Sequence, residues 1–182
     1  GAGEREPGQY FLPPGYVEQA RNLTLDVNRD NGEYWAPWRL EDSGRFQVHV
    51  YRWAARLIRE RGLTSVLDVG CGVGTKLGAH IAPVCADVHA LDQASALEHV
   101  ARRCPSAART EVDLEVSDVR LGRTFDLILC ADVIEHLVEP DRMVEMIKAH
   151  ARRGQGQQGT LVLFSTPERR RLRGQACNAS NK

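Results

Sequence analysis

The sequence predicts an α/β fold: a three-layer α/β/α sandwich around a mostly parallel sheet of about five strands, with an N-terminal helical cap. Three observations predict it. Short apolar runs alternate with stretches of helical period from about residue 64 onward. A glycine-rich turn follows the first run, as where a strand of a parallel sheet passes into a helix. The 182 residues suffice for one domain with a substantial core.

The segment before this alternation differs in composition. Residues 1–31 are rich in Gly, Pro and polar side chains, which predicts an irregular arm with a short helix near 17–21. Three aromatic residues follow, Tyr34, Trp35 and Trp38. We therefore expect an N-terminal arm and cap over residues 1–41.

The next expected element is a helix that begins at a cap on Asp42 or Ser43 and ends at Gly62. Its predicted apolar face consists of Phe46, Val50, Trp53, Ala54, Leu57 and Ile58.

The alternation then gives the elements of the sheet in order. Strands are expected at 64–69, 87–92, 109–114, 124–132 and 159–165, and helices near 75–82, 93–103 and 137–152. Because parallel neighbours need crossover connections, this order predicts helices on both faces of the sheet. The main domain is expected to span 42–167. Residues 168–182 show neither period and are expected to form a disordered tail.

The composition disfavours several classes of partner. The formal net charge is zero, so nothing favours nucleic acid or a membrane surface. No apolar run is long enough to cross a bilayer, and the N-terminus lacks a signal-peptide pattern. Five cysteines without a C-x-x-C pair argue against a disulfide framework and against a zinc site. We expect a cytoplasmic location.

The turn after the first strand carries the most specific pattern. An apolar run ends at Asp68, and glycines follow at alternate positions, Gly70, Gly72 and Gly74. Such a turn at a helix N-terminus lets backbone lie against a nucleotide-like ligand. A dinucleotide fingerprint would have its third small residue at Thr75. A nicotinamide oxidoreductase and a glycine-rich turn without a ligand remain as alternatives.

The pattern D-x-G-x-G-x-G resembles motif I of class I S-adenosylmethionine-dependent methyltransferases, which have a Rossmann-like fold. The resemblance covers roughly residues 60–167. It implies S-adenosylmethionine as cofactor and methylation of a small-molecule acceptor, most simply at oxygen, with no nucleic acid or membrane as partner. In this turn it assigns cofactor contacts to Asp68, Gly70, Cys71, Gly72 and Gly74.

Two acidic positions downstream extend the resemblance. Asp92, followed by Gln93, ends the second expected strand, where the family has an acid that holds both ribose hydroxyls. A helix cap is the alternative role for Asp92. Asp113 and Leu114 resemble the segment that flanks the adenine, with a simple turn as the alternative.

The run 125–137 resembles the family's fourth-strand motif and implies that Cys130 and Ala131 lie beside the cofactor. His136 in this run is the candidate catalytic base, since imidazole titrates near neutrality. A histidine that only bonds backbone or substrate is the alternative.

A metal site is a further alternative for the same run. Asp132, Glu135 and His136 resemble the Mg²⁺-binding D/E-x-x-E-H run of small RNA 2′-O-methyltransferases and of some quinone-precursor methyltransferases. The RNA enzymes have another histidine after the fifth strand, which this sequence lacks. We therefore expect no metal.

Three weaker features complete the expected site. The aromatic residues of the cap form either a lid near the sulfonium or ordinary core. Arg39 or Arg45 is expected to meet the methionine carboxylate of the cofactor. The basic run 169–173 either attracts an anionic acceptor or is a solvated tail.

Class I methyltransferases normally continue with a helix and an antiparallel strand pair, which this sequence lacks. The strand at 159–165 is therefore expected to be a bare edge, with a homodimer formed through it. A truncated cofactor-binding protein without turnover remains the alternative function.

Overall fold

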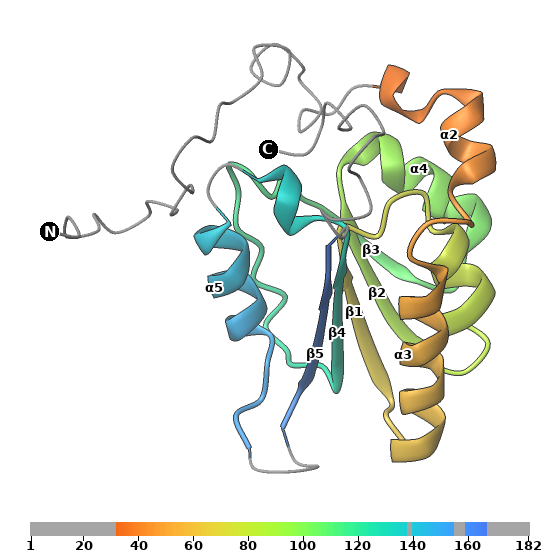
Figure 1. The fold of residues 1–182 in the computed structure, drawn as a ribbon. Helices are drawn as coiled ribbons and strands as arrows, with labels where there is room; N and C mark the ends of the chain where they lie inside the picture. The colour runs from red at the N-terminus through yellow and green to blue at the C-terminus, as the bar shows by residue number, and fades with distance from the viewer. Residues whose placement is uncertain (1–31, 138–139, 155–158, 167–182) are drawn as a thin grey trace, which may run out of the picture.

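The computed structural model describes residues 32–137, 140–154 and 159–166. Its centre is a five-stranded sheet of order β3-β2-β1-β4-β5, in which every neighbouring pair is parallel (Figure 1). The strands are β1 (Ser65–Val69), β2 (Asp87–Asp92), β3 (Ala108–Glu111), β4 (Leu127–Ala131) and β5 (Leu161–Ser165). The predicted α/β class and the five strands are confirmed.

Helices cover both faces of this sheet, as predicted. α3 and α4 lie on one face and α5 on the other (Figure 1). The helices are α2 (Pro37–Asp42), α3 (Val48–Arg61), α4 (Ala94–Arg103) and α5 (Asp141–Ala149), with the short elements η1 (Gly32–Trp35), η2 (Leu77–Ile81) and η3 (Ile134–His136).

The core is divided between the two faces. One cluster packs Ala54 and Ile58 of α3 against Val66 and Leu127 of the sheet. The other packs Met143, Met146 and Ile147 of α5 against Leu67 and Ile128. Strands β1 and β4 are therefore buried at every position, which explains why β4 is apolar throughout and β1 is apolar except at Ser65 and Asp68.

The structure corrects the expected helix 43–61. Residues 43–47 form a turn, and α3 begins only at Val48. Ser43 does not cap it; its hydroxyl donates to the Leu40 carbonyl at 2.7 Å. The C-terminal end is as predicted, because Gly62 has φ 63° and donates to the Ile58 carbonyl.

Two aromatic residues expected on the buried face of that helix are exposed. Phe46 lies in the turn before the helix and is 65% exposed. Trp53 is 52% exposed because it falls outside the arc of α3 that carries the buried residues. Neither contributes to the core.

Other boundaries also differ. The expected helix 137–152 is shorter, since α5 begins at Asp141 and ends at Ala149. The expected boundary between the cap and the main domain, between residues 41 and 42, falls within α2. The predicted helix at 17–21 and the predicted tail 168–182 lie outside the described residues.

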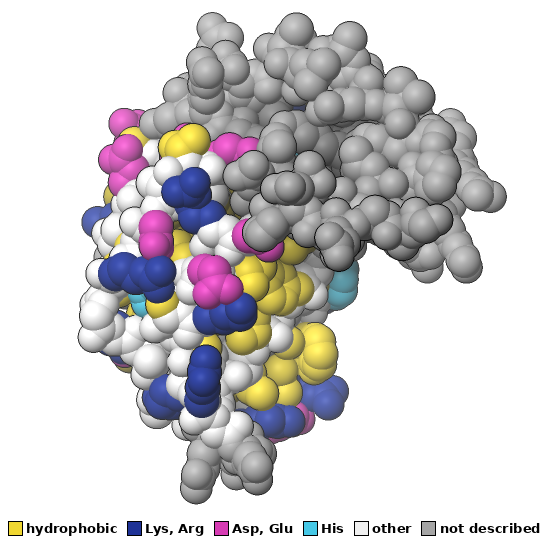
Figure 2. Space-filling view, turned by 90° about the vertical axis from the view of Figure 1, so that its left-hand side faces the viewer, with side chains coloured by type: hydrophobic (Ala, Val, Ile, Leu, Met, Phe, Trp, Pro, Cys, Tyr) yellow, Lys and Arg dark blue, Asp and Glu magenta, His cyan; other side chains and the backbone are white. Residues whose placement is uncertain are grey.

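β5 forms one edge of the sheet that the structure describes. Its Leu161 and Leu163 pack toward the α3 cluster, whereas Val162 and Phe164 are 36% and 45% exposed. Figure 2, seen from the α5 side, shows hydrophobic side chains at the surface among basic ones. None of the described helices combines the length and the apolar character needed to span a membrane.

Candidate functional site

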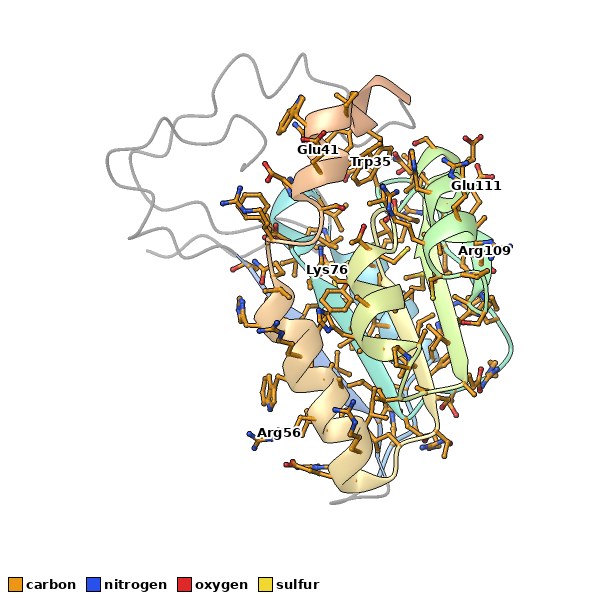
Figure 3. All side chains as sticks on the ribbon, turned by 90° about the vertical axis from the view of Figure 1, so that its right-hand side faces the viewer. Trp35, Glu41, Arg56, Lys76, Arg109 and Glu111 are labelled. Carbon is orange, nitrogen blue, oxygen red and sulfur yellow. The ribbon has the colours of Figure 1, made fainter. Side chains whose placement is uncertain are left out.

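A cavity of about 540 Å³ lies at the carboxyl ends of the strands, where ligands bind in open parallel sheets. Its walls come from the turn after β1, the ends of β2 and β4, residues 112–115, and the cap that includes η1 and α2. In Figure 3, Trp35 and Lys76 lie at this end of the molecule, whereas Arg56 points outward from α3.

The turn after β1 forms the floor of the cavity. Gly70, Gly72 and Gly74 all have positive φ, at 71°, 57° and 75°. A Cβ on Gly70 would lie 2.4 Å from Cγ2 of Val133, so a side chain does not fit there. The turn is tied to β2 because the Gly70 and Cys71 amides donate to the Leu91 carbonyl at 2.8 and 3.1 Å.

Asp92 stands at the end of β2, in the wall beside this turn. Its carboxylate accepts hydrogen bonds from the Gly72 amide at 2.7 Å and from the Gln93 amide at 2.8 Å. The N-cap of α4 is Gln93, without a side-chain cap, so Asp92 is not the helix cap. These two amides hold the carboxylate at the cavity wall.

Asp113 and Leu114 line the cavity from the segment after β3. The Asp113 carboxylate accepts from the Glu115 amide at 3.0 Å, which is the bond of an Asx turn. Asp113 therefore both stabilises this turn and lines the cavity.

Asp68 lies behind the cavity wall. It is fully buried and does not line the cavity. The hydroxyl of Tyr51, which does line it, donates to Asp68 Oδ2 at 2.9 Å, while Oδ1 is buried without a hydrogen-bond partner. Burial raises the pKa of Asp68 to about 7, against the lowering effects of Tyr51 and Lys76.

Cys130 also lies off the cavity. Its thiol is fully buried in β4 and contacts the Met143 sulfur at 3.6 Å. The other predicted site residues, Gly70, Cys71, Gly72, Gly74, Asp92, Gln93, Asp113, Leu114, Ala131 and His136, line one cavity.

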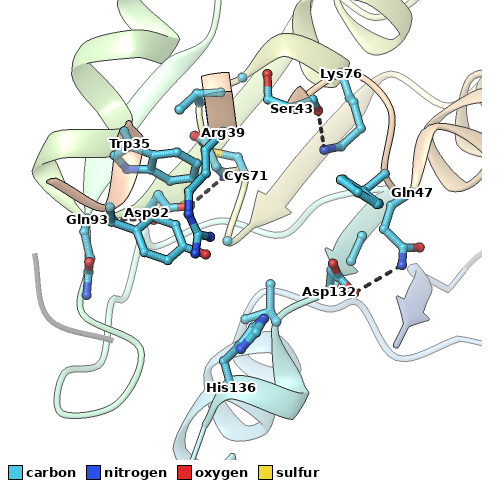
Figure 4. A pocket seen from close by; sticks show the side chains of 18 of the residues that line it. Trp35, Arg39, Ser43, Gln47, Cys71, Lys76, Asp92, Gln93, Asp132 and His136 are labelled. Carbon is cyan, nitrogen blue, oxygen red and sulfur yellow. Dashed lines mark hydrogen bonds between the residues drawn. The ribbon is translucent and has the colours of Figure 1, made fainter. Parts of the chain in front are cut away.

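Aromatic residues of the cap close the cavity from above. Tyr34, Trp35 and Trp38 all line it, and Trp35 comes close to the turn at Gly72. The Arg39 guanidinium lies 4.2 Å from the Tyr34 ring centroid and 4.7 Å from that of Trp38. Figure 4 shows Arg39 extending over the cavity.

The second arginine considered from the sequence is not part of this wall. Arg45 does not line the cavity and pairs with Asp42 at 2.9 Å. Arg39 is therefore the cap arginine that the fold brings to the site.

Several wall residues carry no signal in the sequence. Lys76 donates to the Ser43 carbonyl at 3.0 Å and lies 5.4 Å from the Tyr51 ring centroid, and burial lowers its pKa. Gln47 also lines the wall, as does Asp132 of the run considered for a metal, and both have left-handed backbone, with φ 57° and 63°. Such a conformation at a non-glycine residue costs about 1–2 kcal/mol and is not readable from residue type.

The end of β4 brings acidic residues close together. Both carboxyl oxygens of Glu135 are buried without a hydrogen-bond partner. Burial, and next the neighbouring Asp132 side chain, raise the pKa of Glu135 to about 8. Among the described residues, no group of three or more His, Cys, Asp or Glu side chains is arranged to hold a metal ion.

Comparison with known proteins gives a consistent result. A family model described as a methyltransferase domain matches residues 19–178. A relative in Schizosaccharomyces pombe, named ubiquinone biosynthesis O-methyltransferase, mitochondrial, is 28% identical over 76% of this chain and 57% of its own length. A relative of the same name in Albidiferax ferrireducens, without the word mitochondrial, is 30% identical over 85% of this chain and 65% of its own length.

Solved structures resemble the fold. Streptomyces venezuelae DesVI has a TM-score of 0.57 at 26% identity, covering 71% of this chain and 55% of its own. CalS10 of Micromonospora echinaspora, solved with S-adenosylmethionine bound and described as an amino pentose methyltransferase, has a TM-score of 0.59 at 24% identity, covering 74% and 58%. The chain thus spans little more than half the length of these solved chains and of the S. pombe relative.

Proposed function

Because the chain belongs to the methyltransferase-domain family, we propose that it transfers the methyl group of S-adenosylmethionine to an oxygen of a small molecule. One observation carries this proposal: the glycine turn after β1 and the Asp92 carboxylate at the end of β2 border the same cavity. A backbone cradle beside a fixed carboxylate suits a nucleoside, whose ribose offers two adjacent hydroxyl donors.

The residues present fit this cofactor. The turn 70–74 offers backbone without side chains, and a Cβ at Gly70 would overlap Val133. Asp92 binds the ribose, and the segment at Asp113 and Leu114 borders the adenine. The buried Asp68 carboxyl lies behind the wall, where it accepts a hydrogen bond from the Tyr51 hydroxyl. Arg39 is the cap group suited to the methionine carboxylate.

The bound cofactor supplies an activated methyl group on a sulfonium. The protein then contributes alignment, which is worth on the order of 7–11 kcal/mol when reacting atoms are well oriented. His136, in the wall at the end of β4, accepts the proton of the acceptor hydroxyl as the new bond forms.

The acceptor is proposed by class only. The relatives named ubiquinone biosynthesis O-methyltransferase support an oxygen of a small molecule. We also propose that two copies associate through the β5 edge, on the support of the exposed Val162 and Phe164 side chains. The cytoplasmic location stays a prediction.

The function is tested in two steps. Calorimetry with S-adenosylhomocysteine measures cofactor binding, and methyl transfer is followed with radiolabelled S-adenosylmethionine on a phenol, a catechol, a sugar and an amine. Binding together with transfer to a hydroxyl supports the proposal. Binding without transfer to any probe supports instead a cofactor-binding protein without turnover. Heat stabilisation by NAD(H) but not by S-adenosylhomocysteine would overturn both.

A further inference from the structure

Two strained residues meet at the cavity. Gln47, in the turn before α3, and Asp132, after β4, are the non-glycine residues with positive φ in the described part of the chain. Their side chains bond to one another: Gln47 Nε2 donates to Asp132 Oδ1 at 3.2 Å (Figure 4). Strained backbone at a cavity persists only where the surrounding structure holds it, and it is enriched at functional sites.

Both polar atoms of the Gln47 side-chain amide form hydrogen bonds. Its Oε1 accepts from the Ser165 hydroxyl at 2.9 Å, so its nitrogen is left to donate to Asp132. The backbone repeats this link, because the Asp132 amide donates to the Ser165 carbonyl at 2.9 Å. The Gln47 side chain thereby joins the turn before α3 to the ends of both β4 and β5.

This use of Gln47 is not helix capping. Gln47 is the N-cap residue of α3, yet its side chain makes no cap hydrogen bond. A glycine would adopt φ 57° without strain. A glutamine at this strained position is therefore explained by the hydrogen bonds of its side chain to Asp132 and Ser165, and not by the conformation of the turn.

Asp132 stands at the side of the cavity away from Asp92. In Figure 4, Asp92 and Gln93 lie at one side, whereas Gln47 and Asp132 lie at the other, with His136 nearby. If Asp92 holds the nucleoside, the space beside Asp132 and His136 is left for the acceptor.

We propose that Gln47 is a positioning residue, which orients the Asp132 carboxylate toward the acceptor in the methyltransferase site. This inference rests on the proposed function. Asp132 then receives a hydrogen bond from a second donor group of the acceptor, such as a neighbouring hydroxyl, so that the reacting hydroxyl is left to give its proton to His136. A change at Gln47 should therefore act on the acceptor and not on the cofactor.

Four proteins test this inference: wild type, Gln47→Gly, Gln47→Asn and Arg45→Ala. Gln47→Gly removes the side chain and relieves the backbone, while Asn tolerates left-handed backbone but reaches less far. Arg45→Ala disturbs the same turn at an exposed residue outside the cavity wall. For each protein, the measured values are the melting temperature, the Kd for S-adenosylhomocysteine, and kcat and KM for the best hydroxyl probe of the panel.

For Gln47→Gly we expect an unchanged or higher melting temperature and a Kd within twofold of wild type, with kcat/KM for the acceptor at least tenfold lower. Gln47→Asn should fall between Gly and wild type, and Arg45→Ala should match wild type. Wild-type kcat/KM in Gln47→Gly would overturn the role of Gln47, as would an equal loss in Arg45→Ala. If wild type itself binds S-adenosylhomocysteine but methylates no probe, the proposed function fails, and the role of Gln47 fails with it.

Discussion

The Tyr51 hydroxyl donates a 2.9 Å hydrogen bond to the fully buried Asp68 carboxyl group, which thereby joins α3 to the central strand β1 just behind the cavity. Burial raises the pKa of Asp68 from 3.8 to about 7. The folded protein therefore retains a proton on Asp68 that the unfolded chain has already released between about pH 4 and pH 7. The free energy of unfolding therefore falls, through Asp68, as the pH rises from about 4 to about 7.

Replacing Asp68 with Asn removes this pH dependence. The Asp68→Asn protein should gain stability relative to wild type as the pH rises from 4.5 to 8, by an amount on the order of a few kcal/mol. Thermal unfolding of both proteins across this range measures the effect. Asp126→Asn is the matched control: hydrogen bonds from Arg152 and Thr64 lower the pKa of Asp126, so that its contribution stays constant over the same range. A parallel pH profile for Asp68→Asn and wild type would contradict the burial argument.

Asp92→Ala tests the ribose assignment. It removes a charged acceptor for two hydroxyls, so S-adenosylhomocysteine should bind about 1.5–3 kcal/mol more weakly in titration calorimetry. Asp87→Ala is the control at the opposite end of β2, where the carboxylate is exposed and pairs with Arg123. Unchanged affinity in Asp92→Ala would show that the nucleoside lies elsewhere.

The glycine turn gives a prediction about stability. Gly70→Ala should destabilise the protein by about 1–2 kcal/mol for the left-handed backbone and by a further 1–3 kcal/mol for overlap with Val133. Gly62→Ala is matched to it, because Gly62 has φ 63° but nothing lies within 4 Å of the added Cβ. Urea unfolding should therefore show the larger loss for Gly70→Ala. Equal losses would mean that Val133 moves aside at no cost.

Parts of the fold and of the cavity wall could be predicted from the sequence. The sheet was predictable because β1 and β4 are buried on both faces, so that β4 is apolar throughout and β1 is apolar except at Ser65 and Asp68. Asp92 and the turn 70–74 were predictable because a parallel sheet gathers the carboxyl ends of its strands.

The cap was harder to predict because its geometry depends on tertiary contacts. The apolar pattern placed Phe46 and Trp53 in a core that they do not reach. Asp68 and Cys130 belong to the predicted motifs, but no residue of β1 lines the cavity, and Cys130 faces the opposite side of the sheet from Ala131, which does line it. Nothing in residue type indicates that Gln47 adopts a left-handed conformation and meets Asp132 across 85 residues of chain.

His136→Ala tests the proposed base. With the cofactor aligned and no group to accept the hydroxyl proton, kcat for a hydroxyl probe should fall by about 10²–10⁴. Calorimetry with S-adenosylhomocysteine should give an affinity close to wild type. His49→Ala, at an exposed position of α3 outside the cavity wall, should keep wild-type turnover. A wild-type kcat in His136→Ala would assign proton removal to another group or to solvent.

The β5 edge gives a prediction about association. Val162 and Phe164 are 36% and 45% exposed on β5, which forms an edge of the sheet in the described part of the chain, and unpaired backbone groups at a sheet edge favour pairing with another chain. Static light scattering should therefore show mass rising above 20.3 kDa with concentration. Val162→Lys should shift the protein toward monomer, because a charge at an edge strand opposes pairing. Trp53→Lys changes an exposed aromatic residue on α3, away from this edge, and should leave association unchanged. A monomer at every concentration, or equal dissociation by both variants, would rule out the β5 edge as the interface.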